Sequence, residues 1–208
     1  MESPASVVDH LRRETRAEHR AVERAFEFKA STRSLGAYRK LLERLWGLHL
    51  IWEQRALNVL DVPTLGPRLK SQWLRSDLQG MGLSNDAIAR IALCTLPIEL
   101  RSASCALGSM YVLEGSTLDA QIIYREAAEK LGLTPERYGR FFYGYGTRTA
   151  AMWKGFGELL RSRHAGGELN IDEATTGARA MFVTVTKWLS RAAEPRIDSA
   201  IKGTGTYR

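Results

Sequence analysis

Apolar residues recur at spacings of three and four along most of this chain, which is the period of α-helices that bury one face. The first such stripe covers residues 7–26, and charged side chains occupy the opposite face. This stripe predicts a single amphipathic helix with a histidine on its apolar face. Its inward positions are Val7 or Val8, Leu11, Thr15, His19, Val22 and Phe26.

Capping residues and prolines divide the next part of the chain. Serines suited to the N-cap position begin predicted helices over residues 34–60 and 84–96, and Pro97 ends the second of them. Proline and glycine residues between 63 and 67 indicate a loop, and a short helical segment over residues 69–78 follows it.

The longest predicted helix spans residues 99–131 and stops at Gly132. Its middle, residues 108–121, reads GSMYVLEGSTLDAQ and contains glycine, serine and threonine, which are poor helix formers. Glycine costs about 1 kcal/mol relative to alanine inside a helix. Such residues indicate that something approaches the backbone closely, either a packed neighbouring helix or a flat cofactor.

The last third of the chain continues the helical pattern. Thr134-Pro135-Glu136 predicts a helix start, with proline at the first helical position. A glycine-containing loop over residues 143–146 precedes two further helices, which begin at Thr147 and Asp172.

No internal repeat, strand–turn–strand pattern or linker interrupts these helices, so the sequence predicts one all-α domain. We place this multihelical domain at residues 1–193, followed by a frayed tail at residues 194–208. The chain contains no apolar run of 18 residues, so we expect no membrane span. The first residues lack the pattern of a secretory signal, and the two cysteines lack metal-site spacing, as expected of free thiols in the cytoplasm.

The formal net charge of +7 limits the classes of partner. Lysine and arginine are interspersed with acidic residues, and neither a dense basic run nor a nucleic-acid-binding motif accompanies the charge. We therefore expect no nucleic-acid partner. The excess positive charge suits a carboxylate-bearing ligand or an acidic redox partner.

His19 is the first candidate for chemistry, and Glu23 follows it one helical turn later. The Glu23 carboxylate could accept the imidazole Nδ1–H, which would leave Nε2 to bind iron and would fix the tautomer of the ring. A histidine on an apolar helix face is also commonly a hydrogen-bonded core residue. Periodicity and spacing leave both interpretations open.

Two segments of the chain resemble the heme oxygenases, specifically the bacterial group that forms biliverdin. Residues 11–19, LRRETRAEH, are similar to the proximal helix of that family, and residues 111–118, YVLEGSTL, are similar to its distal helix. The resemblance covers roughly residues 7–189. It implies an all-α fold in which heme lies between a proximal and a distal helix.

The resemblance also implies roles for individual residues on the proximal side and at the heme edge. His19 would be the axial iron ligand, with Glu23 as its hydrogen-bond partner. Arg12 and Tyr111 would contact the heme propionates. Phe182 lies where the family places an aromatic side chain near the heme, although core packing would explain it equally well.

Three further positions match the distal side of the family. Gly115 and Ser116 correspond to residues whose backbone packs over the heme. His49 falls where some bacterial members carry a histidine in the distal water network, and a buried core histidine or a rival ligand is the alternative.

The activity implied by this resemblance is the oxidative cleavage of heme to biliverdin, carbon monoxide and iron with dioxygen. The chain contains no flavin, NAD or iron–sulfur motif, so electrons would come from an external donor such as ferredoxin or a reductase. The biological outlet could be iron acquisition or the supply of a bilin chromophore to a photoreceptor.

One departure from the family pattern concerns Asp119 and Ala120, which stand where the family usually has two glycines. The Asp119 carboxylate could relay protons, it could ligate or block the iron, or the heme could sit differently. A heme carrier with impaired ring opening is therefore the alternative function. A third hypothesis is a helical interaction domain without cofactor, in which Gly108 and Gly115 only permit close helix packing.

Overall fold

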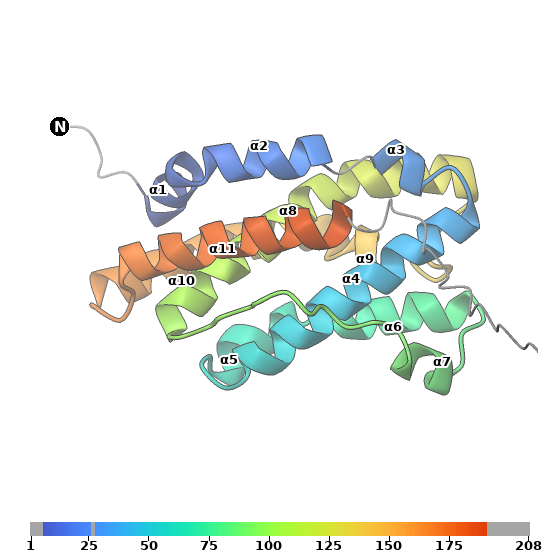
Figure 1. Ribbon diagram of the computed structural model, residues 1–208. Helices are drawn as coiled ribbons and strands as arrows, with labels where there is room; N and C mark the ends of the chain where they lie inside the picture. The colour runs from blue at the N-terminus through green and yellow to red at the C-terminus, as the bar shows by residue number, and fades with distance from the viewer. Residues whose placement is uncertain (1–5, 26–27, 191–208) are drawn as a thin grey trace, which may run out of the picture.

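The described residues of the computed structural model are 6–25 and 28–190, and they form an all-α fold in which two 3-10 turns join the helices (Figure 1). The expectation of an all-α protein is confirmed, and the predicted tail at 194–208 lies outside the described residues. The α-helices are α1 Val7–Glu14, α2 Arg16–Ala25, α3 Phe28–Ser31, α4 Leu35–Ala56, α5 Val62–Leu65, α6 Ser71–Gly80, α7 Asn85–Ala89, α8 Ala103–Leu131, α9 Arg140–Tyr143, α10 Thr149–Ala165 and α11 Ile171–Ser190. The 3-10 helices are η1 Gly66–Arg68 and η2 Gly146–Arg148.

Helix α8 crosses the middle of the molecule and takes part in two apolar cores. Its first half packs with α1, α10 and α11 around buried side chains such as Leu11, Met110 and Phe156. Its second half packs with α4, α6 and α9 around Tyr38 and Leu74. The segment with weak helix formers therefore lies where the two cores meet.

The backbones of α8 and α11 touch each other directly. A Cβ atom at Gly108 would overlap the carbonyl oxygen of Ala174, and one at Gly177 would overlap the carbonyl oxygen of Cys105. The two contacts are reciprocal, because each helix places a glycine against the backbone of the other. Gly108 is thus explained by helix packing alone.

Several predicted helix ends are confirmed by their capping contacts. The Ser34 and Ser84 hydroxyls accept hydrogen bonds from the Ala37 and Ala87 amides, as N-cap residues do. Gly132 follows α8 in the left-handed conformation with φ of 67°. Local sequence therefore determined these boundaries correctly.

The predicted helix over residues 84–96 is wrong beyond Ala89. The chain leaves the helical conformation after α7 and runs along α4, where the Cys94 amide donates to the Gly47 carbonyl over 3.1 Å. A backbone group that finds its partner on another helix does not need the helical ladder. The next helix consequently begins at Ala103, after its N-cap Ser102, rather than at 99.

The helix predicted from Thr134-Pro135-Glu136 is also wrong. Thr134 and Arg137 instead exchange backbone hydrogen bonds of 3.2 and 3.0 Å, which close a turn. The helix that does form, α9, begins at Arg140 because the buried Asp77 carboxylate of α6 accepts its first amides, from Arg140 at 2.9 Å and Phe141 at 2.8 Å. This N-terminal cap comes from a distant part of the sequence.

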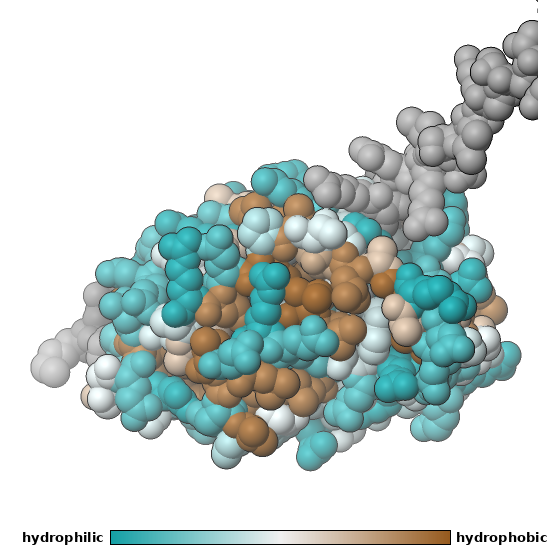
Figure 2. Space-filling view, turned by 60° about the horizontal axis from the view of Figure 1, so that its bottom comes forward, coloured by the Kyte–Doolittle hydropathy of each residue, from teal (hydrophilic) through white to brown (hydrophobic). Residues whose placement is uncertain are grey.

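Exposed apolar side chains occur on several faces of the protein. Figure 2 turns the lower edge of Figure 1 forward and shows an apolar patch in the middle of a polar surface. Over the whole described part of the protein, the large apolar residues that are exposed are Leu35, Leu57, Val62, Leu93, Leu118, Ile122 and Val183. Apolar exposure by itself therefore does not identify a ligand site. Among the described residues, no helix is long and apolar enough to cross a membrane.

Candidate functional site

The first amphipathic stripe forms two helices instead of the single one expected. Thr15 separates α1 from α2, and its buried hydroxyl donates to the Leu11 carbonyl over 2.7 Å. A threonine that donates back to its own helix in this way commonly bends or ends it. The break sets a new direction for α2, the helix that carries His19.

His19 lies half-exposed on α2 beside two of the residues predicted to accompany it. Its Nδ1 is 3.4 Å from a carboxylate oxygen of Glu23, and the two side chains are 47% and 63% exposed. Its ring meets that of Phe182 edge-on, with centroids 5.6 Å apart. A contact between two side chains this exposed contributes little to stability, so it acts mainly on the orientation of the imidazole. With Nδ1 engaged, Nε2 is the nitrogen that can bind a ligand.

Asp119 of α8 lies close to this histidine. Partial burial raises the pKa of its carboxyl, His19 opposes that shift and Glu23 adds to it, so all three groups share one space. No hydrogen bond or ion pair of the Asp119 carboxylate is found in the described part of the chain. The departure from the family pattern therefore lies close to the predicted iron ligand.

Gly115 lies one turn before Asp119, and its surroundings differ from those of Gly108. A Cβ atom at Gly115 would meet only the Trp153 ring, at an ordinary distance of 3.7 Å. Helix packing therefore explains Gly108 and does not explain Gly115. Leu118 and Ile122, which are 37% and 63% exposed, follow at helical spacing, so this face of α8 is open and apolar.

Arg12 and Tyr111 meet at the α1 end of the same face. Burial raises the pKa of Tyr111, while the Arg12 charge and a hydrogen bond with the Thr15 side chain lower it. The Tyr111 ring also packs against Trp153, with centroids 5.7 Å apart. A guanidinium and a phenol hydroxyl placed together can bind a carboxylate.

The hydroxyls of Ser116 and Thr117 are engaged with the backbone of α8 itself. Ser116 Oγ donates to the Leu113 carbonyl over 2.9 Å, and Thr117 Oγ1 donates to the Glu114 carbonyl over 2.6 Å. Ser116 is exposed and Thr117 is buried. Ser116 is therefore the one of the two that borders the open face.

His49 lies in the core and not beside His19. It is 3% exposed on α4, and its ring contacts the Phe141 ring edge-on at 5.3 Å. Burial, together with the nearby Lys70 charge, lowers its pKa to about 3, so the imidazole is neutral at physiological pH. The structure places His49 beside Phe141 and near Lys70. Its part in a distal water network therefore stays a prediction.

We expect His49 to make the protein sensitive to acid. Its pKa is about 3 in the folded protein against 6.5 for a free imidazole, so unfolding takes up a proton below about pH 6.5. The free energy of unfolding should fall by about 2 kcal/mol between pH 6.5 and about 4.5 through this group. Urea unfolding at both pH values should show a loss that is smaller by this amount in His49→Leu. Parallel pH profiles in the two proteins would contradict the assignment.

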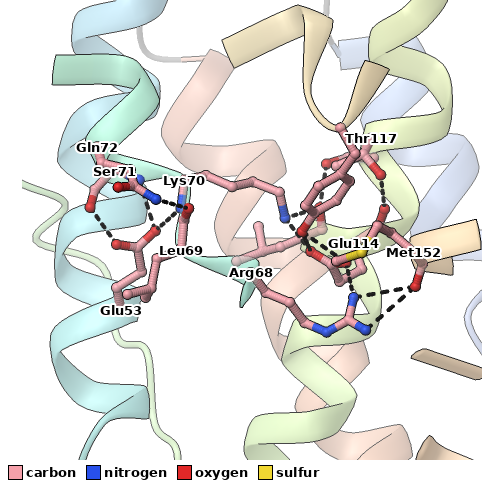
Figure 3. Close-up of polar contacts among 12 residues, drawn as sticks. Glu53, Arg68, Leu69, Lys70, Ser71, Gln72, Glu114, Thr117 and Met152 are labelled. Atoms are coloured by element: carbon pink, nitrogen blue, oxygen red, sulfur yellow. Dashed lines mark hydrogen bonds and ion pairs between the residues drawn. The ribbon is translucent and has the colours of Figure 1, made fainter. Parts of the chain in front are cut away.

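A buried ionic cluster lies behind α8, and sequence reasoning missed it (Figure 3). The Glu114 carboxylate is 1% exposed and accepts hydrogen bonds from Lys70, Arg68 and the Tyr145 hydroxyl, the last over 3.0 Å. Glu53 of α4 in turn accepts the Lys70 amide over 2.6 Å. No local pattern predicts this cluster, because its members come from four separate segments and a charged residue in any one of them is typical of a solvated surface.

A cavity of about 500 Å³ lies beside the cluster, on another face of the molecule. Its lining includes Trp73, Arg140, Tyr143, Tyr145 and Arg148, and none of the residues on the His19 face. The structure thus separates the predicted heme-contacting residues from this cavity. It brings His19 together with Glu23, Phe182 and Asp119, and Arg12 together with Tyr111; Gly115 and Ser116 lie on α8 between Tyr111 and Asp119.

Comparison with protein families returns one match. The model of the family described as heme oxygenase matches residues 5–191, which is nearly the whole chain. No curated protein matches the sequence.

Three solved structures are similar to this one in fold. The NO- and CO-bound heme oxygenase from Neisseria meningitidis has a TM-score of 0.72 and 20% identity, with 90% of this chain and 92% of that chain covered. Heme oxygenase 2 from Chlamydomonas reinhardtii, solved without heme, has a TM-score of 0.73 and 16% identity, with 92% and 99% covered. The heme oxygenase from Leptospira interrogans has a TM-score of 0.65 and 20% identity, with 89% and 99% covered.

Proposed function

This chain belongs to the heme oxygenase family, and we propose that it binds heme through His19 and cleaves it oxidatively to biliverdin, carbon monoxide and iron. The observation that supports this proposal best is the half-exposed pair of His19 and Glu23, which lies close to Asp119 of α8. A histidine oriented by a carboxylate is a common arrangement for a metal ligand.

The residues around His19 suit a flat, partly anionic molecule such as heme. A Cβ at Gly115 would meet no backbone and only the Trp153 ring, at an ordinary distance, and the exposed Leu118 and Ile122 that follow on α8 are apolar. Arg12 and Tyr111 offer a cation and a hydroxyl at one edge, where propionates would lie. When bound, heme would supply both the iron that activates dioxygen and the ring that is opened.

Under this proposal, each residue of the candidate site has a defined role. His19 would bind the iron through Nε2, while Glu23 would hold the Nδ1 proton and so fix the tautomer. Phe182 would support the imidazole from the side. The Gly115 and Ser116 backbone would lie over the opposite heme face and limit the space there.

The electron donor would approach along α2. Arg16, Arg20 and Arg24 are exposed at intervals of four residues, and none has an ion-pair partner among the described residues. An unpaired basic stripe on the helix that carries His19 would attract an acidic protein. We propose ferredoxin or a reductase as the donor, a cytoplasmic location, and iron acquisition or a bilin-dependent photoreceptor as the outlet.

The proposed function is tested by adding one equivalent of hemin to the purified protein, followed by ferredoxin and its reductase in air. We expect the Soret band to decay while a broad bilin absorption grows in the red. A heme spectrum that persists under electron supply would contradict the oxygenase and favour the heme-carrier alternative. Failure to bind hemin would contradict both.

Asp119 is the observation that favours the carrier alternative. A bound heme would cover this carboxylate, which has no hydrogen-bonding partner in the described part of the chain, and burying an unpaired carboxylate is unfavourable. We therefore expect Asp119→Ala to bind hemin about 10-fold more tightly, which corresponds to about 1.4 kcal/mol.

Hemin titration of the apoprotein, followed through the Soret band, measures this effect. Asp86→Ala serves as the matched control, because Asp86 is an exposed aspartate on the remote helix α7. Weaker hemin binding by Asp119→Ala would instead show that the carboxylate contacts the heme favourably. The same titration thereby distinguishes an obstructing carboxylate from one that ligates or donates to the bound group.

A further inference from the structure

We propose that the buried cluster of Glu114, Lys70, Arg68 and Tyr145 is a positioning device that holds the α8 turn over residues 113–117. This inference rests on the proposed function, because that turn presents Gly115 and Ser116 to the face where heme would bind. The cluster itself touches neither His19 nor Asp119, so its members act through the helix backbone.

The first support is the hydrogen bonding of the turn. The Leu113 carbonyl accepts both Lys70 Nζ, at 3.2 Å, and the Ser116 hydroxyl, at 2.9 Å. The next carbonyl, that of Glu114, accepts the Thr117 hydroxyl. Donors from outside the helical ladder tilt carbonyls outward and bend the helix at that point. Lys70 thus binds the backbone of α8 in the turn that contains Gly115.

The second support is the placement of charge. Glu114, Lys70 and Arg68 have side chains that are 1%, 4% and 10% exposed, so the two cations and the carboxylate are desolvated together. Buried ion clusters are often no more stabilising than apolar residues of the same volume. Stability alone therefore gives little reason for this cluster, whereas a fixed geometry of α8 does.

The third support is that the backbone of Lys70 is itself held in place. The Glu53 carboxylate of α4 accepts the amides of Lys70 and Ser71, at 2.6 and 2.9 Å, and thereby fixes the start of α6 (Figure 3). At the residue of α8 that follows Glu114, a Cβ at Gly115 would meet only the Trp153 ring, at an ordinary distance. The buried contacts of Lys70 and Glu114 thus hold the turn that contains Gly115, and under the proposed function they would set its distance from a bound heme.

The decisive variant is Lys70→Met, which removes the donor to Leu113 and leaves Arg68 and Tyr145 to bind Glu114. Lys130→Met is the matched control, because Lys130 lies on α8 itself, away from residues 113–117, and forms an ion pair with Glu126 at the surface. In the apoprotein, we expect amide hydrogen exchange at residues 115–119 to accelerate at least 5-fold in Lys70→Met. Exchange at residues 125–131 should stay unchanged, and Lys130→Met should leave the 115–119 amides unaffected.

A second readout uses the ferric heme complex with azide as the probe. Azide affinity should fall at least 5-fold in Lys70→Met, while hemin affinity changes by less than 2-fold, because the altered turn lies on the side opposite His19. A purely structural role would not separate these two affinities. If Lys70→Met does not fold, Tyr145→Phe carries the test, and at least a 2-fold change in the same directions is expected.

Unchanged exchange at residues 115–119 in the variant would overturn the positioning role, whatever the heme activity of the protein. Accelerated exchange in Lys70→Met, together with failure of the unaltered protein to bind hemin, would support the positioning of α8 by Lys70 and overturn the proposed function. Equal losses of azide and hemin affinity would show a general loss of structure and would also overturn the positioning role.

Discussion

Replacement of His19 by alanine is expected to abolish the histidine-type heme spectrum and to weaken hemin binding by on the order of 100-fold. His19 presents Nε2 at a half-exposed position while Glu23 engages Nδ1, and its ring is supported by Phe182. Loss of the imidazole removes the ligand and leaves the Arg12 and Tyr111 edge unchanged. Hemin titration should therefore show a weak complex with a shifted Soret band.

Added imidazole should restore the histidine-type spectrum of His19→Ala, because the space left by the side chain would admit it. His164→Ala is the control, since His164 is exposed on α10 and its ring contacts the Leu169 carbonyl. An unaltered spectrum in His19→Ala would overturn the ligand assignment. The buried His49 would then be examined next, by the corresponding substitution.

Replacement of Gly108 by alanine is expected to destabilise the protein by about 3 kcal/mol, at the upper end of the usual cost of overpacking. The new methyl group would overlap the Ala174 carbonyl, and a backbone cannot move aside as a flexible side chain can. Helices α8 and α11 would have to separate, and with them the apolar core that they share. Urea unfolding followed by circular dichroism measures the loss.

Gly155→Ala is the matched control for this substitution. Gly155 lies inside α10, and a Cβ there would meet no atom within 4 Å. The same change should therefore stabilise the protein by up to about 1 kcal/mol through helix propensity. If Gly108→Ala were as stable as Gly155→Ala, the close approach of α8 to α11 would be refuted.

Local sequence predicted the parts of the fold that depend on neighbours along the chain. Ser34, Ser84 and Gly132 cap helices where expected, because a cap is formed by atoms three or four residues away. The contact of His19 with Glu23 was predicted for the same reason, since a spacing of four residues places both side chains on one helix face.

Long-range contacts decided the elements that the sequence patterns described wrongly. Residues 90–98 leave the helix because Cys94 finds a backbone partner on α4, and α9 starts where Asp77 of α6 caps it. The buried contacts of Lys70 and Glu114 likewise join residues 44 positions apart. A hydrophobic pattern carries no information on such partners.

The two glycines of α8 look alike in the sequence but have different surroundings in the folded protein. From the sequence alone, α8 is a long helix with weak helix formers in its middle, and His19 and Glu23 share a helix face. The sequence treats Gly108 and Gly115 alike, because both are glycines inside one helix. The tertiary structure separates them: Gly108 lies against the backbone of α11, while a Cβ at Gly115 would meet only the Trp153 side chain, at an ordinary distance. A glycine has no side chain, so its effect on packing depends on which atoms of other segments occupy the space next to it, and these segments are distant in sequence.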